Sequence, residues 1–322
     1  MCRRWYGCQR SIRKISKLKA ISEFKIIEKY LSNIGTSYNI KNKVIRGVGD
    51  DAAVISLSKN LIVSTDTSVE GVHFLKGIKP EYAAYRACVT ALSDLAAMGS
   101  QPLAFQLSLS TKESNSKFFS SFKKGLQDFS NDYKIGLIGG DLVKGQYQIS
   151  VTVFGKQHSN ILLRNNACVG DILCLSGPLG NGLFGMQDFK KFNKKNKTSS
   201  AYLKPKALID YGKSIAGFAS SAIDISDGFL QDLGHLSKAS NVGFELSSSL
   251  IPHNSNLSLN QCLNCGDDYQ LIFTVPKKHI QPLTKKMKRK KLAIYQVGNS
   301  IKRKNILLDG KIPALSKGYN HF

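Results

Sequence analysis

Segments with strand-like and helix-like spacing alternate along most of the chain, and this alternation constrains the fold more than any other feature. Within residues 104–110, the apolar Phe105, Leu107 and Leu109 alternate with polar residues, which is typical of a strand with one exposed face. Pro80 opens a longer helical segment from Glu81 to about Met98, and Gly99 closes it. Repetition of such segments predicts an α/β or α+β fold.

The remaining elements follow the same pattern before and after a turn-rich patch near residue 157. Strands are expected at residues 61–64, 135–138, 149–154, 171–175 and 269–275. Helices are expected from about residue 22 and at residues 114–132, 206–221 and 228–240, with a polar surface loop at 190–200. We therefore predict a basic N-terminal extension (1–20), an N-terminal α/β unit (21–157) and a C-terminal α/β unit (158–322).

The positive charge of the chain lies mainly at its two ends. Residues 1–20 carry seven Lys and Arg and no acid, and residues 277–322 carry thirteen against one acid, so the ends supply +19 of the net +24. No nucleic-acid-binding motif surrounds these Lys-rich runs, and a solvated surface is the favoured interpretation over specific nucleic-acid binding. A basic nucleic-acid-binding protein remains the alternative from a different class.

Cysteine usage and hydropathy bear on the location of the protein. Seven scattered cysteines do not resemble a disulfide framework, and the lone Cys262-x-x-Cys265 pair lacks the further ligands of a structural zinc site. No segment approaches 18 consecutive apolar residues, so no membrane span is expected, and residues 1–20 lack the apolar core of a secretory signal. A cytoplasmic protein is predicted.

The acidic residues are scarce and concentrated. The chain has 22 Asp and Glu against 46 Lys and Arg, yet half of the acids lie in a few glycine-flanked or strand-end motifs. These acids are Asp50, Asp51, Asp66, Glu70, Asp94, Asp141, Asp224, Asp227, Asp232, Asp267 and Asp268. Clustered carboxylates repel one another unless cations neutralise them, and oxygen-rich sites of this kind suit Mg²⁺ together with substrate phosphates.

Common nucleotide-binding motifs are missing from the sequence. It contains no G-x-x-x-x-G-K-[ST] phosphate loop and no protein-kinase motif set, and Gly177, Gly180 and Gly182 do not form the dinucleotide fingerprint. A nucleotide would therefore be held chiefly through magnesium ions.

The motifs and their order resemble the thiamine-monophosphate kinases of the aminoimidazole-ribonucleotide synthetase superfamily. The resemblance covers about residues 22–322 and rests on Gly49-Asp-Asp-Ala-Ala-Val, Ser64-Thr-Asp-Thr, Glu70-Gly-Val-His-Phe, Leu92-Ser-Asp-Leu-Ala-Ala-Met-Gly, Leu137-Ile-Gly-Gly-Asp, Ile223-Asp-Ile-Ser-Asp-Gly, Gly266-Asp-Asp-Tyr and Lys317-Gly-Tyr-Asn-His-Phe. It implies an N-terminal α/β domain whose sheet pairs across a homodimer, and a C-terminal α/β domain. It also implies ATP-dependent phosphorylation of thiamine monophosphate to the diphosphate, with several Mg²⁺ ions and ATP as co-substrate.

The resemblance further implies a role for each matching residue. The positions that match metal ligands are Asp51, Thr65, Asp66, Asp94, Asp141, Asp224 and Asp227. Of these, the resemblance implies a catalytic role for Asp94, Asp141 and Asp227. The positions that match ATP contacts are Gly140, Asp141, Arg164 and Ser226. Those that face thiamine monophosphate are His73, Asp267 and Tyr319.

The chain departs from the family pattern at three positions. Asp267 stands where the family usually has Glu, Ala91 where it has Asn, and Lys144 where Arg is common. The first two changes touch expected substrate contacts, so a family member that binds a thiamine phosphate without turnover is an alternative. Another ATP-using enzyme of the same superfamily is the nearest rival.

Overall fold

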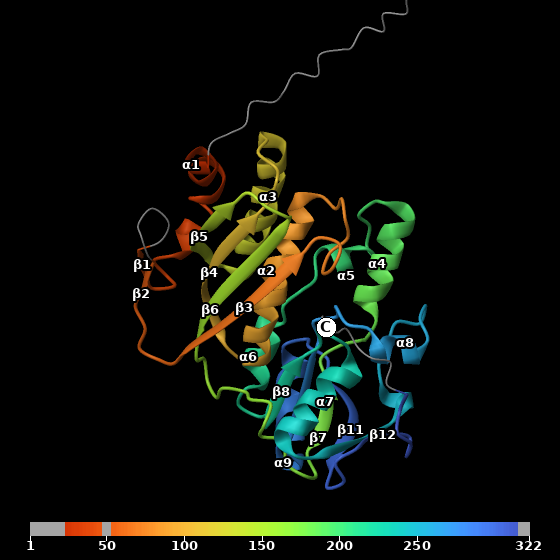
Figure 1. The fold of residues 1–322 in the computed structure, drawn as a ribbon. Coiled ribbons are helices and arrows are strands. Elements are labelled where there is room, and N and C mark those ends of the chain that lie inside the picture. The colour runs from red at the N-terminus through yellow and green to blue at the C-terminus, as the bar shows by residue number, and fades with distance from the viewer. Residues whose placement is uncertain (1–22, 47–52, 315–322) are drawn as a thin grey trace, which may run out of the picture.

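The computed structural model describes residues 23–46 and 53–314, in which two β-sheets lie on either side of one long helix (Figure 1). The first sheet has the order β3-β6-β4-β5, with β6 antiparallel to both neighbours and β4 parallel to β5. Its strands are β3 (Leu61–Val69), β4 (Gln101–Ser110), β5 (Gly136–Val143) and β6 (Gln148–Lys156).

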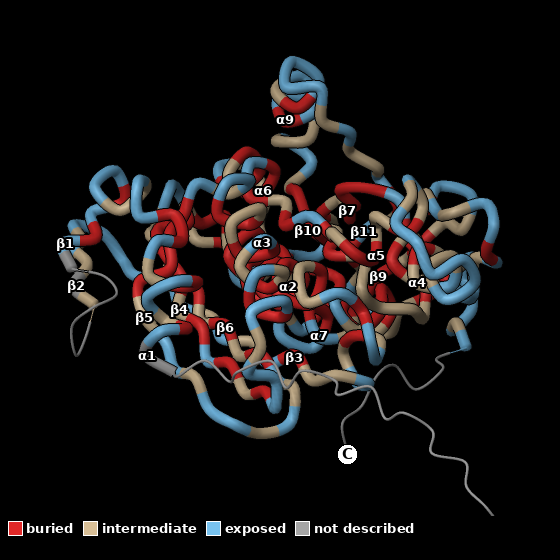
Figure 2. Tube along the Cα trace, turned by 90° about the horizontal axis from the view of Figure 1, so that it is seen from above, coloured by how far each residue is buried: buried red, intermediate tan, exposed pale blue. Residues whose placement is uncertain are grey.

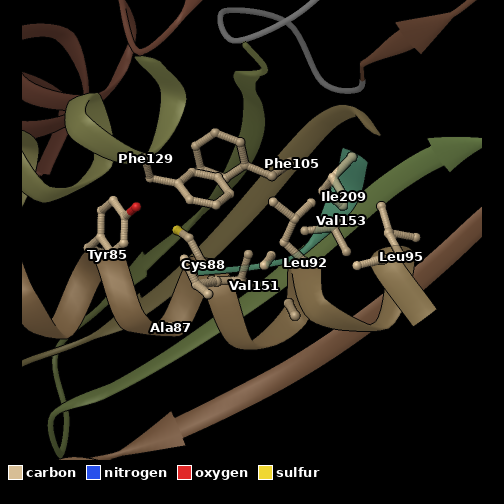
Figure 3. Packing of buried hydrophobic residues seen from close by; sticks show 14 of the residues in the cluster. Tyr85, Ala87, Cys88, Leu92, Leu95, Phe105, Phe129, Val151, Val153 and Ile209 are labelled. Carbon is tan, nitrogen blue, oxygen red and sulfur yellow. The ribbon is translucent and has the colours of Figure 1, made fainter. Parts of the chain in front are cut away.

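Helices α2 (Pro80–Ala97) and α3 (Ser116–Tyr133) cover one face of this sheet. The predicted alternation in β4 is confirmed, because Phe105, Leu107 and Leu109 are buried against the helices. Figure 3 shows Phe105 beside Phe129 of α3, above the side chains of α2. On the opposite face, β3 exposes Leu61, Val63, Thr65 and Thr67.

The N-terminal part of the described chain packs around this first unit. It consists of α1 (Glu23–Ile26), a π-helical turn (Ile27–Leu31), a 3-10 turn (Thr36–Tyr38), and the short strands β1 (Val44–Arg46) and β2 (Val54–Ile55). The helical spacing expected from about residue 22 is confirmed in outline, since Tyr30, Leu31 and Ile34 are buried.

The second sheet has six strands in the order β12-β9-β11-β7-β10-β8. They are β7 (Ile172–Leu175), β8 (Ser221–Asp224), β9 (Gly243–Leu246), β10 (Leu271–Val275), β11 (Tyr295–Ile301) and β12 (Ile306–Leu308). Strand β10 is buried at every position, because it lies between β7 and β8 with apolar side chains on both faces, as expected for residues 269–275. The helices of this half are α4 (Asn181–Phe192), α5 (Ser200–Leu203), α6 (Ile209–Ile215), α7 (Phe229–Ser240), α8 (Leu259–Asn264) and α9 (Lys277–Arg289).

Helix α2 joins the two halves. It contacts β3 and β6 of the first sheet as well as β8 and α6 of the second half, and a single apolar core runs through all of them. Figure 2 shows the buried residues concentrated around α2, whereas α9 lies at the outer edge of the molecule in this view. The close approach of α6 to α2 requires Gly212, since a Cβ there would lie 1.9 Å from the carbonyl oxygen of Ala96.

Two sequence predictions need correction. The helix predicted at 206–221 is much shorter, because α6 covers only Ile209–Ile215 and the chain then enters β8, which pairs with β10 from Ser221 onward. The loop predicted at 190–200 is shorter at its start, because α4 continues through Phe192. Within the described residues, no helix has the length and apolar character needed to span a membrane.

Candidate active site

A pocket of about 780 Å³ is lined by residues of both halves of the molecule. Five aspartates line it, and we call four of them, from three segments of the chain, the aspartate cluster. They are Asp66 on β3, Asp94 on α2, Asp224 at the end of β8 and Asp227 in the turn before α7. The fold thus brings together carboxylates from three segments that are far apart in the sequence.

The carboxylates of the aspartate cluster repel one another. Burial, with the nearby charges of Asp94 and Asp227, raises the pKa of Asp66 to about 6. Burial and the charge of Asp94 raise the pKa of Asp224 to about 7. Burial also raises the pKa of Asp94. The pocket therefore concentrates negative charge that a cation would offset.

Two serines orient the cluster. Ser64 of β3 donates a short hydrogen bond to Asp94, and Ser93 of α2 donates one of 2.6 Å to Asp224. Both bonds favour the ionised carboxylates and lower their pKa values, which partly opposes the effect of burial. They also run between different elements, so they fix the relative positions of β3, α2 and β8 at the pocket.

Internal carboxylates already occupy the two helix N-termini beside the pocket. Asp232 accepts hydrogen bonds from the backbone N–H groups of Ser226, Asp227 and Gly228 at the start of α7. Asp268 accepts from Gly180 N–H at 2.6 Å and Gly182 N–H at 3.0 Å at the start of α4. Helix N-termini are common phosphate sites, and at these two an internal carboxylate already accepts hydrogen bonds from some of the backbone N–H groups.

A second group in the pocket is centred on a buried arginine. The guanidinium of Arg86 on α2 forms an ion pair with Asp267, and the hydroxyl of Tyr269 donates a hydrogen bond of 2.7 Å to the same carboxylate. His73 lies on the loop after β3, and its Nδ1 accepts a hydrogen bond from the backbone N–H of Val69. His73, Arg86, Asp267 and Tyr269 all line the pocket.

The structure gathers seven of the sequence-predicted site residues in the pocket and places others elsewhere. Those in the pocket are Asp66, His73, Asp94, Asp224, Ser226, Asp227 and Asp267. The described residues that do not line it are Thr65, Gly140, Asp141 and Arg164. Asp51 and Tyr319 lie outside the described residues.

Local structure accounts for these placements. Successive residues of a strand point to opposite faces, so Thr65 lies on the outer face of β3, where its hydroxyl is 2.8 Å from that of Thr152. Gly140 and Asp141 lie on the edge strand β5, and a Cβ at position 140 would collide with the Leu107 carbonyl oxygen at 1.8 Å. Arg164 is exposed, and its charge helps to lower the pKa of Asp94.

The carboxylates of the pocket suit a magnesium ion that also binds water and substrate phosphates. They suit less well a metal ion whose ligands all come from the protein. Among the residues that the structure describes, no three His, Cys, Asp or Glu side chains form a ready-made metal site. Magnesium usually takes only one or two carboxylates and completes its shell with waters and substrate phosphates. The mutually repelling aspartates provide such partial ligation.

Sequence reasoning did not identify Arg86, Ser64 or Ser93 as site residues. A usable signal existed for Arg86, which is the one basic residue in the apolar, alanine-rich sequence of α2. A charged side chain on such a helix is rarely buried without a partner. The serines carried no comparable signal.

The fold and the site define an AIR synthase related protein. The family model for the N-terminal domain of these proteins matches residues 49–157, and the model for their C-terminal domain matches residues 169–310.

Individual relatives narrow this assignment. Thiamine-monophosphate kinase of Buchnera aphidicola subsp. Schizaphis graminum is 38% identical, over 94% of this chain and 99% of the relative. That of Haemophilus influenzae is 32% identical, over 94% and 98%. The chain belongs to the thiamine-monophosphate kinase family.

Solved structures agree with this membership. The crystal structure of thiamine-monophosphate kinase from Stenotrophomonas maltophilia has a TM-score of 0.82 at 27% identity, covering 92% of this chain and 99% of that one. The structure of AaThiL complexed with AMPPCP and TMP has a TM-score of 0.75 at 30% identity, covering 93% and 97%.

Proposed function

We propose that the pocket transfers the terminal phosphoryl group of ATP directly to the phosphate of thiamine monophosphate, giving thiamine diphosphate and ADP. The observation that carries this proposal is the convergence of Asp66, Asp94, Asp224 and Asp227 in one pocket between the two sheets. Support for the substrates comes from the family and from AaThiL, a related structure that holds AMPPCP, an analogue of ATP, together with TMP.

The aspartate cluster is proposed to hold magnesium. The internal carboxylates at both neighbouring helix N-termini support this, because Asp232 and Asp268 already accept hydrogen bonds from backbone N–H groups that a phosphate could otherwise use. When bound, magnesium would cancel the repulsion between the two polyanionic substrates and stabilise the charge on the transferring group. That repulsion is about 4 kcal/mol for two unit charges 4 Å apart at an effective dielectric constant near 20.

The residues of the chain then have simple tasks. The acceptor oxygen of a phosphate monoester is already anionic near neutral pH, so no side chain has to remove a proton from it. Ser64 and Ser93 keep Asp94 and Asp224 in place. The walls of the pocket align the two substrates. We propose Asp94 and Asp227, which line the pocket, and Asp141, which lies outside it on β5, as the catalytic aspartates.

The remaining roles rest on the family resemblance. We propose Asp51, Thr65 and Asp141 as further metal ligands, and Gly140, Asp141, Arg164 and Ser226 as ATP contacts. For thiamine monophosphate we propose His73, Asp267 and Tyr319. Two of these, His73 and Asp267, lie in the same pocket as the aspartate cluster, which supports a continuous site for both substrates.

Oligomeric state, location and domain limits are proposed as well. We propose a homodimer that pairs through the outer face of the first sheet, where β3 exposes Leu61 and Val63. A cytoplasmic location is supported by the free thiols of the five cysteines among the described residues. The limits 1–20, 21–157 and 158–322 are kept as the proposed domains.

The decisive experiment incubates the purified protein with ATP, magnesium and thiamine monophosphate. We expect thiamine diphosphate and ADP in equal amounts, and no product when EDTA exceeds magnesium. Thiamine itself serves as the comparison substrate. Product from thiamine but none from the monophosphate would refute the proposal.

A further inference from the structure

The side chain of Arg86 is enclosed by three segments of the chain. Its Nη2 lies 2.7 Å and 2.8 Å from the two carboxylate oxygens of Asp267 and 3.4 Å from the carbonyl oxygen of His73. Its Nη1 donates a short hydrogen bond to the carbonyl oxygen of Tyr202 on α5. Only 4% of this side chain is exposed. Both terminal nitrogens are thus engaged within the protein, and a substrate phosphate has little access to them.

Tyr202 connects the same arginine to the loop that carries His73. Its ring lies under the guanidinium, with 3.9 Å between the guanidinium carbon and the ring centre. Its hydroxyl accepts a hydrogen bond of 3.0 Å from the backbone N–H of Leu75. The loop between β3 and α2 is therefore attached to Arg86 directly, through the His73 carbonyl, and indirectly through Tyr202.

The segment on the other side of Arg86 has an unusual backbone. Asp267 and Tyr269 both have positive φ, of 69° and 51°, a region that residues other than glycine rarely adopt. Such a conformation persists only where surrounding contacts hold it. The contacts here are the ion pair with Arg86, the Tyr269 hydroxyl on the carboxylate, and the hydrogen bond from the Asp267 N–H to the Ser226 carbonyl oxygen.

We propose that Arg86 is a positioning residue for thiamine monophosphate, which fixes Asp267 and the His73 loop relative to each other. This inference rests on the proposed function, because it takes His73 and Asp267 as substrate contacts. The side chain of Asp267 is 27% exposed, which leaves its carboxylate accessible to an N–H donor such as the substrate's amino group. Arg86 acts on the substrate only through these two partners.

The test compares Arg86→Lys with a matched Arg303→Lys variant. Lysine keeps the charge, but its single nitrogen replaces the two terminal nitrogens with which Arg86 bonds Tyr202 on one side and Asp267 and His73 on the other. Arg303 makes an exposed hydrogen bond to Asn305 on the loop between β11 and β12, and its replacement is the control. For Arg86→Lys we expect KM for thiamine monophosphate to rise about tenfold or more, with KM for ATP changed less than twofold.

Hydrogen exchange supplies a readout that does not depend on turnover. In Arg86→Lys, the amides of Gly71 and Leu75, and those of residues 267–269, should exchange about tenfold faster than in the wild type. A double variant with Asp267→Asn should raise KM for thiamine monophosphate no more than the larger single effect, because Arg86 acts through Asp267.

The outcomes separate this inference from the proposed function. Unchanged exchange in a folded Arg86→Lys protein, or equal increases in KM for both substrates, overturns the positioning role. If the wild type makes no thiamine diphosphate, the proposed function fails, and exchange alone decides whether Arg86 holds the two segments. If Arg86→Lys does not fold, Tyr202→Phe takes its place, because it removes only the hydroxyl that accepts the hydrogen bond from Leu75. The proposal then requires faster amide exchange in this variant. It also requires KM to rise for thiamine monophosphate, with KM for ATP changed less than twofold.

Discussion

Ser93 of α2 and Asp224 of β8 are joined by a hydrogen bond of 2.6 Å in the buried interior beside the pocket. Ser93 belongs to the helix that covers the first sheet, and Asp224 ends an outer strand of the second sheet. One hydroxyl thus links the two halves of the molecule at a carboxylate of the aspartate cluster.

Replacement of Ser93 by alanine should therefore affect both stability and magnesium use. Loss of a buried hydrogen bond to a charged group costs about 1.5–3 kcal/mol of unfolding free energy. Without this donor the pKa of Asp224 rises further, so the magnesium concentration for half-maximal rate should increase several-fold. Ser237→Ala is the control, because Ser237 donates a comparable buried bond to the Val242 carbonyl oxygen away from the pocket. If the magnesium concentration for half-maximal rate increased equally in both variants, the hydrogen bond from Ser93 to Asp224 would have no specific effect on magnesium use.

Asp94→Asn should separate activity from stability. The amide keeps the shape and still accepts the Ser64 hydrogen bond, but it removes a charge from the aspartate cluster. We expect the turnover number to fall by about 100-fold or more, and the melting temperature to stay equal or rise because repulsion is relieved. Initial rates at saturating magnesium and a thermal melt measure the two effects. Asp210→Asn, at an exposed position of α6, should change neither, and near-normal turnover of Asp94→Asn would argue against the metal role.

The pH dependence of stability should show the effect of Asp268. Burial raises the pKa of this carboxyl to about 6, from 3.8, in the folded state. Between these values the folded protein binds more protons than the unfolded chain, so this group's contribution to the unfolding free energy decreases as pH rises from about 4 to 6. The loss is at most about 3 kcal/mol, since each pKa unit corresponds to about 1.4 kcal/mol.

Comparison with Asp268→Asn isolates this contribution. Urea unfolding of both proteins at pH 4.5 and pH 7 gives the change for each, and other carboxyl groups cancel in the difference. The wild type should lose more stability than the variant between these two pH values. A smaller loss in the wild type would mean that the Gly180 and Gly182 N–H bonds outweigh burial.

The contact between α2 and α6 should tolerate no side chain at position 212. A Cβ there would meet the Ala96 carbonyl oxygen at 1.9 Å, so Gly212→Ala must push the two helices apart. We expect a loss of about 1–3 kcal/mol or more in the unfolding free energy, measured by urea denaturation. Gly217→Ala is the matched control, because nothing lies within 4 Å of its added Cβ and its effect should be near zero. Equal stabilities would show that this packing is not tight.

Several elements of both halves could be predicted from local sequence. The alternating residues 104–110, the proline and glycine that flank α2, and the apolar run of β10 each specify one element, because side-chain periodicity reports which face is buried. Other elements could not be predicted from local sequence. Helix α9 contains Pro282, which local rules disfavour inside a helix, yet tertiary packing of Leu283 and Met287 buries its inner face.

By itself, the sequence determined that acids and glycines are concentrated in a few motifs, and it thereby determined the chemistry: carboxylates that suit magnesium and phosphate. Only the tertiary structure decided which of them meet. It turned Asp66 toward the pocket and the adjacent Thr65 away, and it paired Asp267 with Arg86, which is 181 residues distant. The physical reason is that periodicity is a local property, whereas a pocket is formed by packing between segments far apart in the chain.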